Sequence, residues 1–190
     1  MNHLRVMTFY PINFLRNLAL NGTSTRFVFV NDIDFIPCRE SYKRLLKYTK
    51  KLKKNQLLVI PAFEELSNGT RLADQFPENK NALMKLWNEE AVVPFHFTDF
   101  MPGHNATNYK KWSRAKNPYQ IKWTKWYEPY VVGYTAELPK YNQQYVGRYE
   151  NKAEHVAEMY ARGFELLVLP DVCIVHVWHP RAARDSNMYR

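Results

Sequence analysis

The amino-acid sequence predicts an α/β domain in which helices pack against a layered sheet. Short apolar runs alternate with amphipathic segments along the 190 residues, as in chains that build such sheets. The hydrophobic share of 46% is that of a globular protein with a real core. Pro11, Gly22 and Gly163 stand where helices are expected to begin or end. The chain, residues 1–190, is therefore predicted to form a single domain.

The expected elements follow in order along the chain. Strands are expected at 26–31, 56–63, 128–134, 164–169 and 172–177, which are short runs rich in apolar residues. Helices are expected at 11–21, 41–54, 79–88 and 151–162. The periodicity places these side chains inward on the first two helices: Phe14, Leu15, Leu18, Leu45, Leu46 and Leu52. The segment from about 94 to 127 has little periodicity and is expected to be a functional loop.

The net charge is +9, and a basic surface attracts polyanions such as nucleic acids, acidic glycans or diphosphates. Much of the excess lies between residues 43 and 54, where a solvated helix face explains it. The sequence contains no recognised nucleic-acid-binding motif, so no nucleic-acid partner is expected.

The cysteines and the N-glycosylation sequons are informative about the cellular compartment of the protein. The two cysteines, Cys38 and Cys173, match no metal-binding spacing, and the sequence leaves open whether they form a disulfide. Three Asn-x-Ser/Thr sequons begin at Asn21, Asn68 and Asn105, all in turn-like sequence. Together the three sequons favour a protein of the secretory pathway, glycosylated at these asparagines.

Asp32 and Asp34 directly follow the apolar run that ends at Asn31. Ligands of α/β sheets bind beyond the carboxyl ends of strands, and two carboxylates on a turn can converge on one divalent cation. Such a triplet also occurs by chance, and either aspartate could merely cap the turn. His176, near the end of the last expected strand, could complete the coordination shell. His179 is a second candidate, although the two histidines would face opposite sides if the strand continued.

The middle segment carries residue types that bind sugars, since aromatic faces pack on C–H surfaces and planar polar groups bind hydroxyls. Asn108 and Trp112 are the substrate-binding candidates. A loop packed down by its own aromatics is the alternative for most of the others: His96, His104, Tyr109, Trp123 and Trp126.

Glycosyl transfer with inversion needs a general base on the acceptor hydroxyl. Glu128 and Glu150 are the main candidates. Asp99, Glu64 and Glu65 are further possibilities, and the residues alone do not choose among these five.

The chain also resembles a known family. The segments that carry the resemblance run in colinear order through most of the chain: YPINFLRNLAL, FVFVNDIDFIP, LLVIPAFE, GHNATNYKKW, PYQIKW, EPYVV, NKAEHVAEMYARGFELLVLPD and IVHVWH. They are similar to glycosyltransferase family 49, namely the glucuronyltransferase domain of the LARGE glycosyltransferases and, more distantly, the β-1,4-glucuronyltransferase of dystroglycan glycan synthesis.

The resemblance implies a GT-A-type fold with a mixed, mainly parallel sheet. It implies an Mn²⁺ ion, a UDP-glucuronic acid donor and inverting transfer to a xylose-containing, acidic glycan. It also implies the Golgi lumen and a type II membrane protein, with the membrane contacted only through an N-terminal anchor outside this chain. Asp32 and Asp34 match the family's Asp-x-Asp motif, and His176 matches its shared histidine.

Two departures from the family motivate an alternative function. The family's nucleotide-binding half begins before YPIN, so the first strands of the fold are expected to be missing. Residues 147–152 read GRYENK where the family has GFGWNK or GFNR. Asn151 and Lys152 survive and are expected beside the sugars, whereas Glu150 is particular to this sequence. The alternative is a catalytically impaired relative that serves as a glycan- or nucleotide-binding module.

Overall fold

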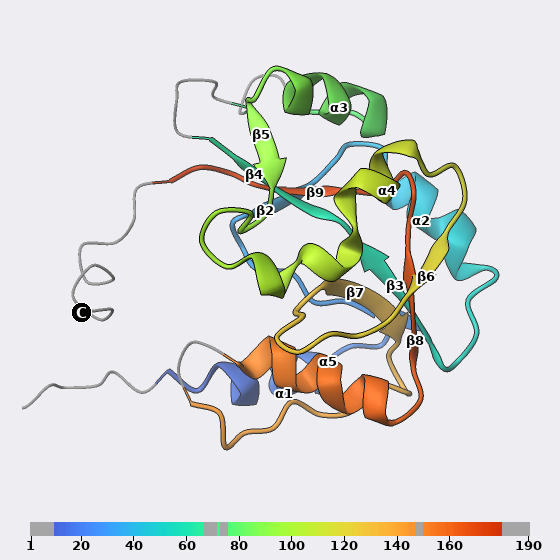
Figure 1. Ribbon diagram of the computed structural model, residues 1–190. Helices are drawn as coiled ribbons and strands as arrows, with labels where there is room; N and C mark the ends of the chain where they lie inside the picture. Colours follow the sequence, from blue (N-terminus) through green and yellow to red (C-terminus); the bar gives the residue numbers. More distant parts are fainter. Residues whose placement is uncertain (1–9, 67–71, 73–75, 147–149, 180–190) are drawn as a thin grey trace, which may run out of the picture.

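The computed structural model describes residues 10–66, 72, 76–146 and 150–179, and it has a mixed α/β architecture (Figure 1). The helices are α1 (Ile12–Asn21), α2 (Ser41–Thr49), α3 (Lys80–Asn88), α4 (Tyr109–Arg114) and α5 (Asn151–Ala161), with short 3-10 turns η1 (Met101–Gly103) and η2 (Asn105–Thr107). The strands are β1 (Phe27–Phe29), β2 (Phe35–Pro37), β3 (Gln56–Ile60), β4 (Ala62–Glu65), β5 (Val92–Pro94), β6 (Tyr119–Ile121), β7 (Tyr130–Tyr134), β8 (Glu165–Val168) and β9 (Ile174–His176).

The described strands form two mixed sheets, one with the order β1-β7-β3-β8-β6 and the other with the order β2-β9-β4-β5. The pairs β3–β8 and β4–β9 are parallel. The other five pairings between described strands are antiparallel. The expectation of a mainly parallel sheet is therefore wrong. Parallel neighbours need long crossovers, and most of these short strands instead meet their neighbours in the opposite direction.

The predicted strand over 56–63 is divided at Pro61 into β3 and β4, which belong to different sheets. Proline has no N–H for a sheet ladder, so it suits the point where the chain leaves one sheet for the other. The segment from β8 to β9 makes the same passage beside it. These two segments join the sheets. One of them contains β3, the most buried strand, and successive residues of β3 pack alternately into two separate apolar clusters on its two faces.

Helix α1 has the expected length but buries a different face. Phe14, Leu15 and Leu18 are 52%, 40% and 58% exposed, so their predicted burial is wrong. Besides Leu20, the buried side chains of this helix are Asn13 and Asn17. Their amides bond to backbone groups of residues 141–142, which lie outside regular structure and need such partners.

Helix α2 ends at Thr49, five residues before the predicted end. Leu52 is buried as expected, and Leu45 packs against an apolar cluster. Leu46 is 44% exposed, so its predicted inward orientation is wrong. Of the described helices, none combines the length and the apolar character needed to cross a bilayer.

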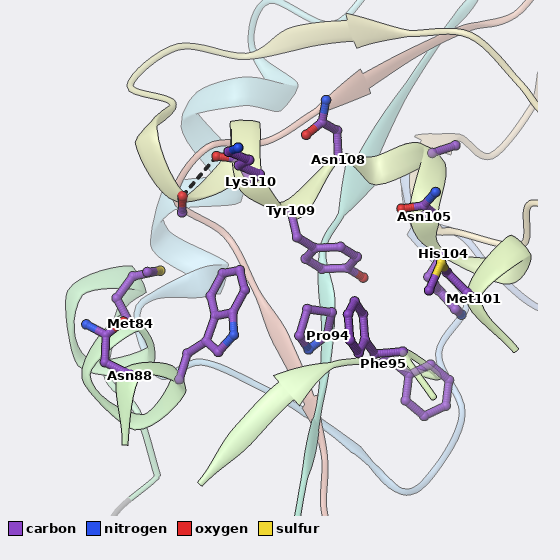
Figure 2. A pocket seen from close by; sticks show the side chains of 14 residues that line it. Met84, Asn88, Pro94, Phe95, Met101, His104, Asn105, Asn108, Tyr109 and Lys110 are labelled. Atoms are coloured by element: carbon purple, nitrogen blue, oxygen red, sulfur yellow. Dashed lines mark hydrogen bonds between the residues drawn. The ribbon is translucent and has the colours of Figure 1, made fainter. Parts of the chain in front are cut away.

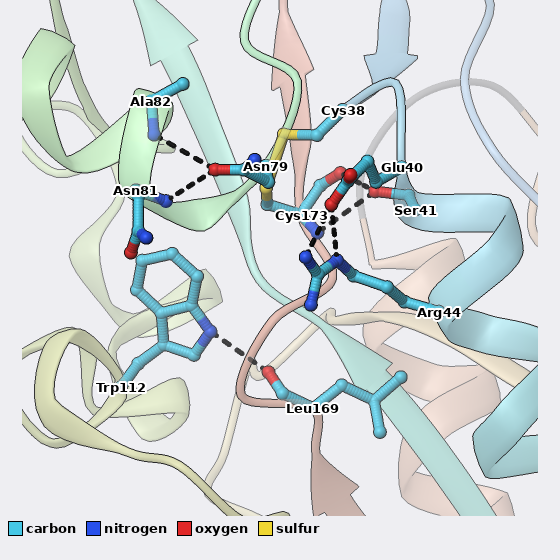
Figure 3. Close-up of a disulfide and its surroundings, with 10 residues drawn as sticks. All are labelled: Cys38, Glu40, Ser41, Arg44, Asn79, Asn81, Ala82, Trp112, Leu169 and Cys173. Atoms are coloured by element: carbon cyan, nitrogen blue, oxygen red, sulfur yellow. Dashed lines mark hydrogen bonds and ion pairs between the residues drawn. A yellow bond between two sulfur atoms is a disulfide. The ribbon is translucent and has the colours of Figure 1, made fainter.

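A disulfide joins Cys38 and Cys173, the pair that the sequence left open (Figure 3). Cys38 follows β2 and Cys173 precedes β9, so the bridge closes one end of this two-stranded ladder. Ser41 reinforces the junction, because its hydroxyl donates to the Cys173 carbonyl over 3.0 Å. The disulfide thereby ties the edge strand β2 to the interior of its sheet.

Candidate functional site

The Asp32–Asp34 turn lies between β1 and β2. The Asn31 amide donates to the Phe35 carbonyl over 2.9 Å, and the Phe35 N–H donates to the Asp32 carbonyl over 3.2 Å. These two bonds close the turn and leave Ile33 fully exposed. The side chains of the two aspartates take different partners.

The register of β2 with β9 brings Asp34 and His176 together across 142 residues of sequence. Phe35 pairs with His176 in this antiparallel ladder, and the Val177 N–H donates to the Asp34 carbonyl over 3.0 Å. His176 is the last residue of β9, so His179 lies beyond the strand. The objection that positions 176 and 179 face opposite sides therefore does not apply.

Asp34, His176 and His179 form a group with the donor atoms that a divalent cation needs. Asp34 Oδ2 lies 3.2 Å from His176 Nε2 and 3.5 Å from His179 Nε2. All three potential ligand atoms lie within 4.8 Å of one another. Burial lowers the pKa of His176 although Asp34 opposes the shift, which favours the neutral imidazole that binds metals. Asp34 Oδ1 is buried and has no hydrogen-bond partner among the described residues, so the carboxylate retains a lone pair for an ion.

Asp32 is held instead by cationic and hydroxyl donors. Lys152 Nζ donates to Asp32 Oδ2 over 2.8 Å, Tyr130 Oη donates to the same oxygen over 2.7 Å, and Arg16 lies 3.6 Å from Oδ1. Burial alone would raise the pKa of Asp32, but Lys152, Tyr130 and Arg16 outweigh it and lower the pKa. Asp32 is therefore a carboxylate at neutral pH, fixed beside the Asp34 group by three side chains.

Glu128 is a base candidate that interacts electrostatically with Lys152, Asp32 and Arg16 of this charge network. Burial raises the pKa of its carboxyl; Lys152 opposes the shift and Asp32 reinforces it. Glu150 is exposed, with a left-handed backbone (φ 58°) just before α5.

The other three carboxylates lie in different settings. Glu65 is buried and accepts the N–H groups of Leu72 and Trp178, so it fixes the chain just after His176. Glu64 pairs in register with His176 on the neighbouring strand. Asp99 is exposed and accepts a hydrogen bond from its neighbour Thr98.

The comparison with known families decides what kind of protein carries this group. The sequence profile of a family described as glycosyl-transferases for dystroglycan matches residues 2–187. The chain belongs to this glycosyltransferase family.

Several curated members of the family are similar along most of this chain. The xylosyl- and glucuronyltransferase LARGE2s of Gallus gallus is 40% identical over 174 residues, covering 90% of this chain and 23% of that protein. The LARGE2 of Homo sapiens is 37% identical over 190 residues, covering 95% and 26% respectively. Human LARGE1 is 34% identical over 190 residues, covering 96% and 24%. The chain thus spans about a quarter of the length of these relatives.

The substrate-binding candidates of this family member lie in different environments. Lys152 is in the charge network, and Asn151 beside it is buried and accepts a hydrogen bond from Arg16 over 2.5 Å. Asn108 has a left-handed backbone (φ 56°) and caps α4 by accepting the Lys111 N–H.

A sugar-stacking role for Trp112 does not fit its position. The ring is fully buried, and its Nε1 donates to the Leu169 carbonyl over 3.0 Å (Figure 3). Trp112 therefore belongs to the apolar core.

The sequons also differ in their surroundings. Asn21 is exposed at the end of α1, and Asn105 is exposed at the start of η2. The hydroxyl of Thr107, the third residue of the Asn105 sequon, lies 2.8 Å from the Tyr127 hydroxyl in the interior. Asn68 lies outside the described residues, as do residues 147–149 of the departing GRYENK segment.

Sequence reasoning missed Arg16 and Tyr130, two of the three residues that hold Asp32. Arg16 is on α1, and no motif distinguishes it from the other cations of the chain. Tyr130 lies two residues after Glu128 in a predicted strand, and its period-2 relation to Glu128 was the available signal.

Proposed function

We propose that this domain transfers glucuronic acid from UDP-glucuronic acid to a xylose-containing glycan, such as that on dystroglycan, with inversion at the anomeric carbon. Membership of the family and the printed names of its relatives support this substrate class. The observation that carries the proposal is the Asp34–His176 pair, which joins a turn carboxylate to an imidazole at the end of β9. The two mixed sheets are consistent with a GT-A-type fold.

We infer that Mn²⁺ is the cofactor and that Asp34 and His176 hold it, with His179 in reach of the same position. The partnerless Oδ1 of Asp34 and the two imidazoles are suitable donors. The ion would neutralise charge on the diphosphate as UDP departs. Asp32, the other residue of the Asp-x-Asp motif, accepts hydrogen bonds from Lys152 and Tyr130 instead.

We assign the general base to Glu128 in preference to Glu150. Its raised pKa brings the carboxyl nearer to the value that suits proton transfer at neutral pH. In the proposed step, Glu128 takes the proton of the acceptor hydroxyl while the hydroxyl oxygen bonds to the anomeric carbon. The bond from that carbon to the diphosphate breaks on the opposite face, and UDP leaves.

The disulfide and the sequons support a location in the secretory pathway. Disulfides persist in oxidising compartments, and sequons are used only by proteins that enter them. We propose further, as the family resemblance implies, that the protein acts in the Golgi lumen as a type II membrane protein, with N-linked glycans on Asn21, Asn68 and Asn105.

Calorimetric titration with UDP, with and without Mn²⁺, tests the metal assignment. The unsubstituted chain should bind UDP more tightly when Mn²⁺ is present. Asp34→Ala and His176→Ala should remove this dependence without changing the thermal unfolding midpoint appreciably, whereas Asp99→Ala, which removes an exposed carboxylate, should leave it intact. Mn²⁺-dependent binding that persists in both site variants would rule out the assignment.

The second candidate function is a binding module that holds glycan or nucleotide without catalysis. The GRYENK sequence at 147–152 favours it, because the small and apolar approach to Asn151 and Lys152 is replaced by larger polar residues. Transfer of radiolabelled glucuronic acid to a xyloside by the 190-residue chain would exclude this candidate. Mn²⁺-dependent UDP binding with no transfer would establish it.

A further inference from the structure

A cavity of about 750 Å³ lies between α3, β5, the η1–η2 segment and α4 (Figure 2). Its volume is in the range of small-ligand sites. The lining includes the aromatic rings of Trp87, Phe97 and Tyr109 and the side-chain amide of Asn88. Aromatic rings pack on the C–H faces of sugar rings while amides bind polar substituents, so this composition suits a carbohydrate.

Two large apolar side chains of the lining are exposed to solvent. Phe97 is 52% exposed and Met101 is 46% exposed. Single exposed apolar residues are common on protein surfaces, but apolar residues that gather at a cavity mark a surface that another group covers. The group that covers Phe97 and Met101 therefore has to be identified.

A sequon asparagine belongs to the wall of the same cavity. Asn105 is exposed at the start of η2, and Figure 2 shows it with Met101 on one side of the cavity and Asn88 on the other. An Asn-x-Thr sequon is an acceptor for an N-linked oligosaccharide. The first sugar of such a glycan, an N-acetylglucosamine on Asn105 Nδ2, therefore starts at the cavity itself.

The burial of the sequon threonine determines when the glycan is attached. Thr107 is 1% exposed, and its hydroxyl lies 2.8 Å from the Tyr127 hydroxyl in the interior. Attachment therefore precedes folding, while the sequon is still accessible. In that step Asn105 Nδ2 bonds to the anomeric carbon of a lipid-linked oligosaccharide and loses a proton, and the lipid diphosphate leaves. The cavity then forms beside a glycan that is already in place.

Covalent attachment allows weak contacts to hold the sugar. A tethered group has an effective concentration on the order of mM at its own site, so it occupies a cavity that a free sugar would fill poorly. Apart from Lys110 and the buried His104, the described lining residues carry no ionisable acid or basic nitrogen that would need a charged partner. A neutral acetamido sugar matches this lining.

We propose that the innermost sugars of an N-linked glycan on Asn105 fold back into this cavity and cover Phe97 and Met101. The presence of the glycan rests on the proposed function, in which Asn105 is glycosylated. Its place in the cavity rests on the lining and on the point of attachment. The glycan is then a structural part of the domain, because it packs against the weakly periodic segment from 94 to 127.

Enzymatic release of glycans from the folded glycoprotein tests the proposal. The chain is secreted from cultured animal cells behind an added signal peptide, and site-specific mass spectrometry measures occupancy and native release by peptide-N-glycosidase F. A docked glycan is protected from the enzyme, so release from Asn105 should be about tenfold slower than release from Asn21, which lies outside the cavity lining. Phe97→Ala should accelerate release from Asn105 and leave release from Asn21 unchanged.

Phe14→Ala is the matched control for this substitution. Phe14 is also 52% exposed but lies on α1, so its removal should leave release from Asn105 as slow as in the unsubstituted chain. This control separates protection by the cavity from the local geometry of the Asn105 turn, which is the same in both variants.

An anilinonaphthalene sulfonate dye, which fluoresces on exposed apolar surfaces, provides a second readout. Asn105→Gln removes the glycan and should raise the dye fluorescence, whereas Asn21→Gln should not. Produced without glycosylation, the unsubstituted chain and the Asn105→Gln chain should give the same fluorescence. This comparison isolates the effect of the glycan from the effect of the substitution.

An occupied Asn105 whose glycan is released as fast in the unsubstituted chain as in Phe97→Ala would overturn the docking alone. Equal dye fluorescence of the glycosylated unsubstituted and Asn105→Gln chains would overturn it as well, since the cavity would then be open to other ligands. An unoccupied Asn105 would contradict both the docking and the proposed glycosylation. Calorimetry with UDP and Mn²⁺ on the same glycoprotein tests the donor site separately, and its failure would leave the release and fluorescence results unaffected.

Discussion

Breaking the Cys38–Cys173 disulfide should both destabilise the domain and loosen the Asp34 group. β2 has only three residues and, among the described strands, pairs with β9 alone. Asp34 immediately precedes β2, and His176 ends β9. The disulfide therefore anchors the short edge strand that positions Asp34 against His176.

The magnitude follows from the length of chain that the bridge closes. The cysteines are 135 residues apart, and the chain-entropy model gives a loop of this length about 5 kcal/mol of stabilisation. Measured values usually lie nearer 2–4 kcal/mol, roughly a third of the stability of a typical domain. We expect a loss of about 3 kcal/mol in the free energy of unfolding.

Urea unfolding of the oxidised chain and of the chain reduced with dithiothreitol provides the assay. Reduction retains the two buried sulfur atoms, so the comparison isolates the cross-link. The double variant Cys38→Ala with Cys173→Ala should lose the same free energy of unfolding from the missing cross-link. It should lose a smaller further amount because the two buried sulfur atoms are removed. Reduction should also weaken Mn²⁺-dependent UDP binding. Equal unfolding free energies of the oxidised and reduced chains would refute the reasoning.

Three further predictions concern single residues. Asn17→Leu should cost roughly 1–3 kcal/mol for each Tyr141 backbone group left unpaired, as measured by urea unfolding. Asp32 has a lowered pKa, so its stabilising effect is complete above its ordinary value of 3.8 and is lost as the pH falls through the folded value. Lys152→Met should therefore reduce the acid dependence of unfolding between pH 2 and 6, as measured by circular dichroism. Glu128→Gln should lower the transfer rate by about 10²–10⁴-fold, and the rate of the unsubstituted chain should fall as the pH drops through the raised Glu128 pKa.

A specific experimental result would contradict each of these three predictions. An Asn17→Leu variant no less stable than Leu18→Ala, which truncates an exposed residue of the same helix, would contradict the burial of the amide. An unchanged acid dependence in Lys152→Met would contradict the Asp32 ion pair. Transfer by Glu128→Gln at the normal rate would exclude Glu128 as the base.

Elements with strong local patterns could be predicted closely from the sequence. The helix expected at 79–88 is α3, with Asn79 as its cap, and the helix expected at 151–162 is α5. β2, β5 and β6, which have three residues each, were not predicted. The face that α1 buries depends on backbone groups more than a hundred residues away, which hydrophobic periodicity does not register.

The candidate site, too, could be predicted from the sequence only in part. A turn after a strand and a histidine at the end of another strand are local patterns, and the structure brings Asp34 and His176 together. The separate environment of Asp32 could not be predicted, because Arg16, Tyr130 and Lys152 come from three elements whose packing the sequence does not state. The cavity lined by α3, β5, the η1–η2 segment and α4 (Figure 2) could not be predicted either, since its lining is assembled from four segments.

A crystal structure of the chain with Mn²⁺ and UDP would test the central claim most directly, because anomalous scattering locates the manganese independently of its ligands. We predict manganese within coordination distance of an Asp34 carboxylate oxygen and of His176 Nε2, in contact with the diphosphate. Manganese bound elsewhere, or UDP bound without manganese at Asp34, would contradict the assignment of this group as the catalytic metal site.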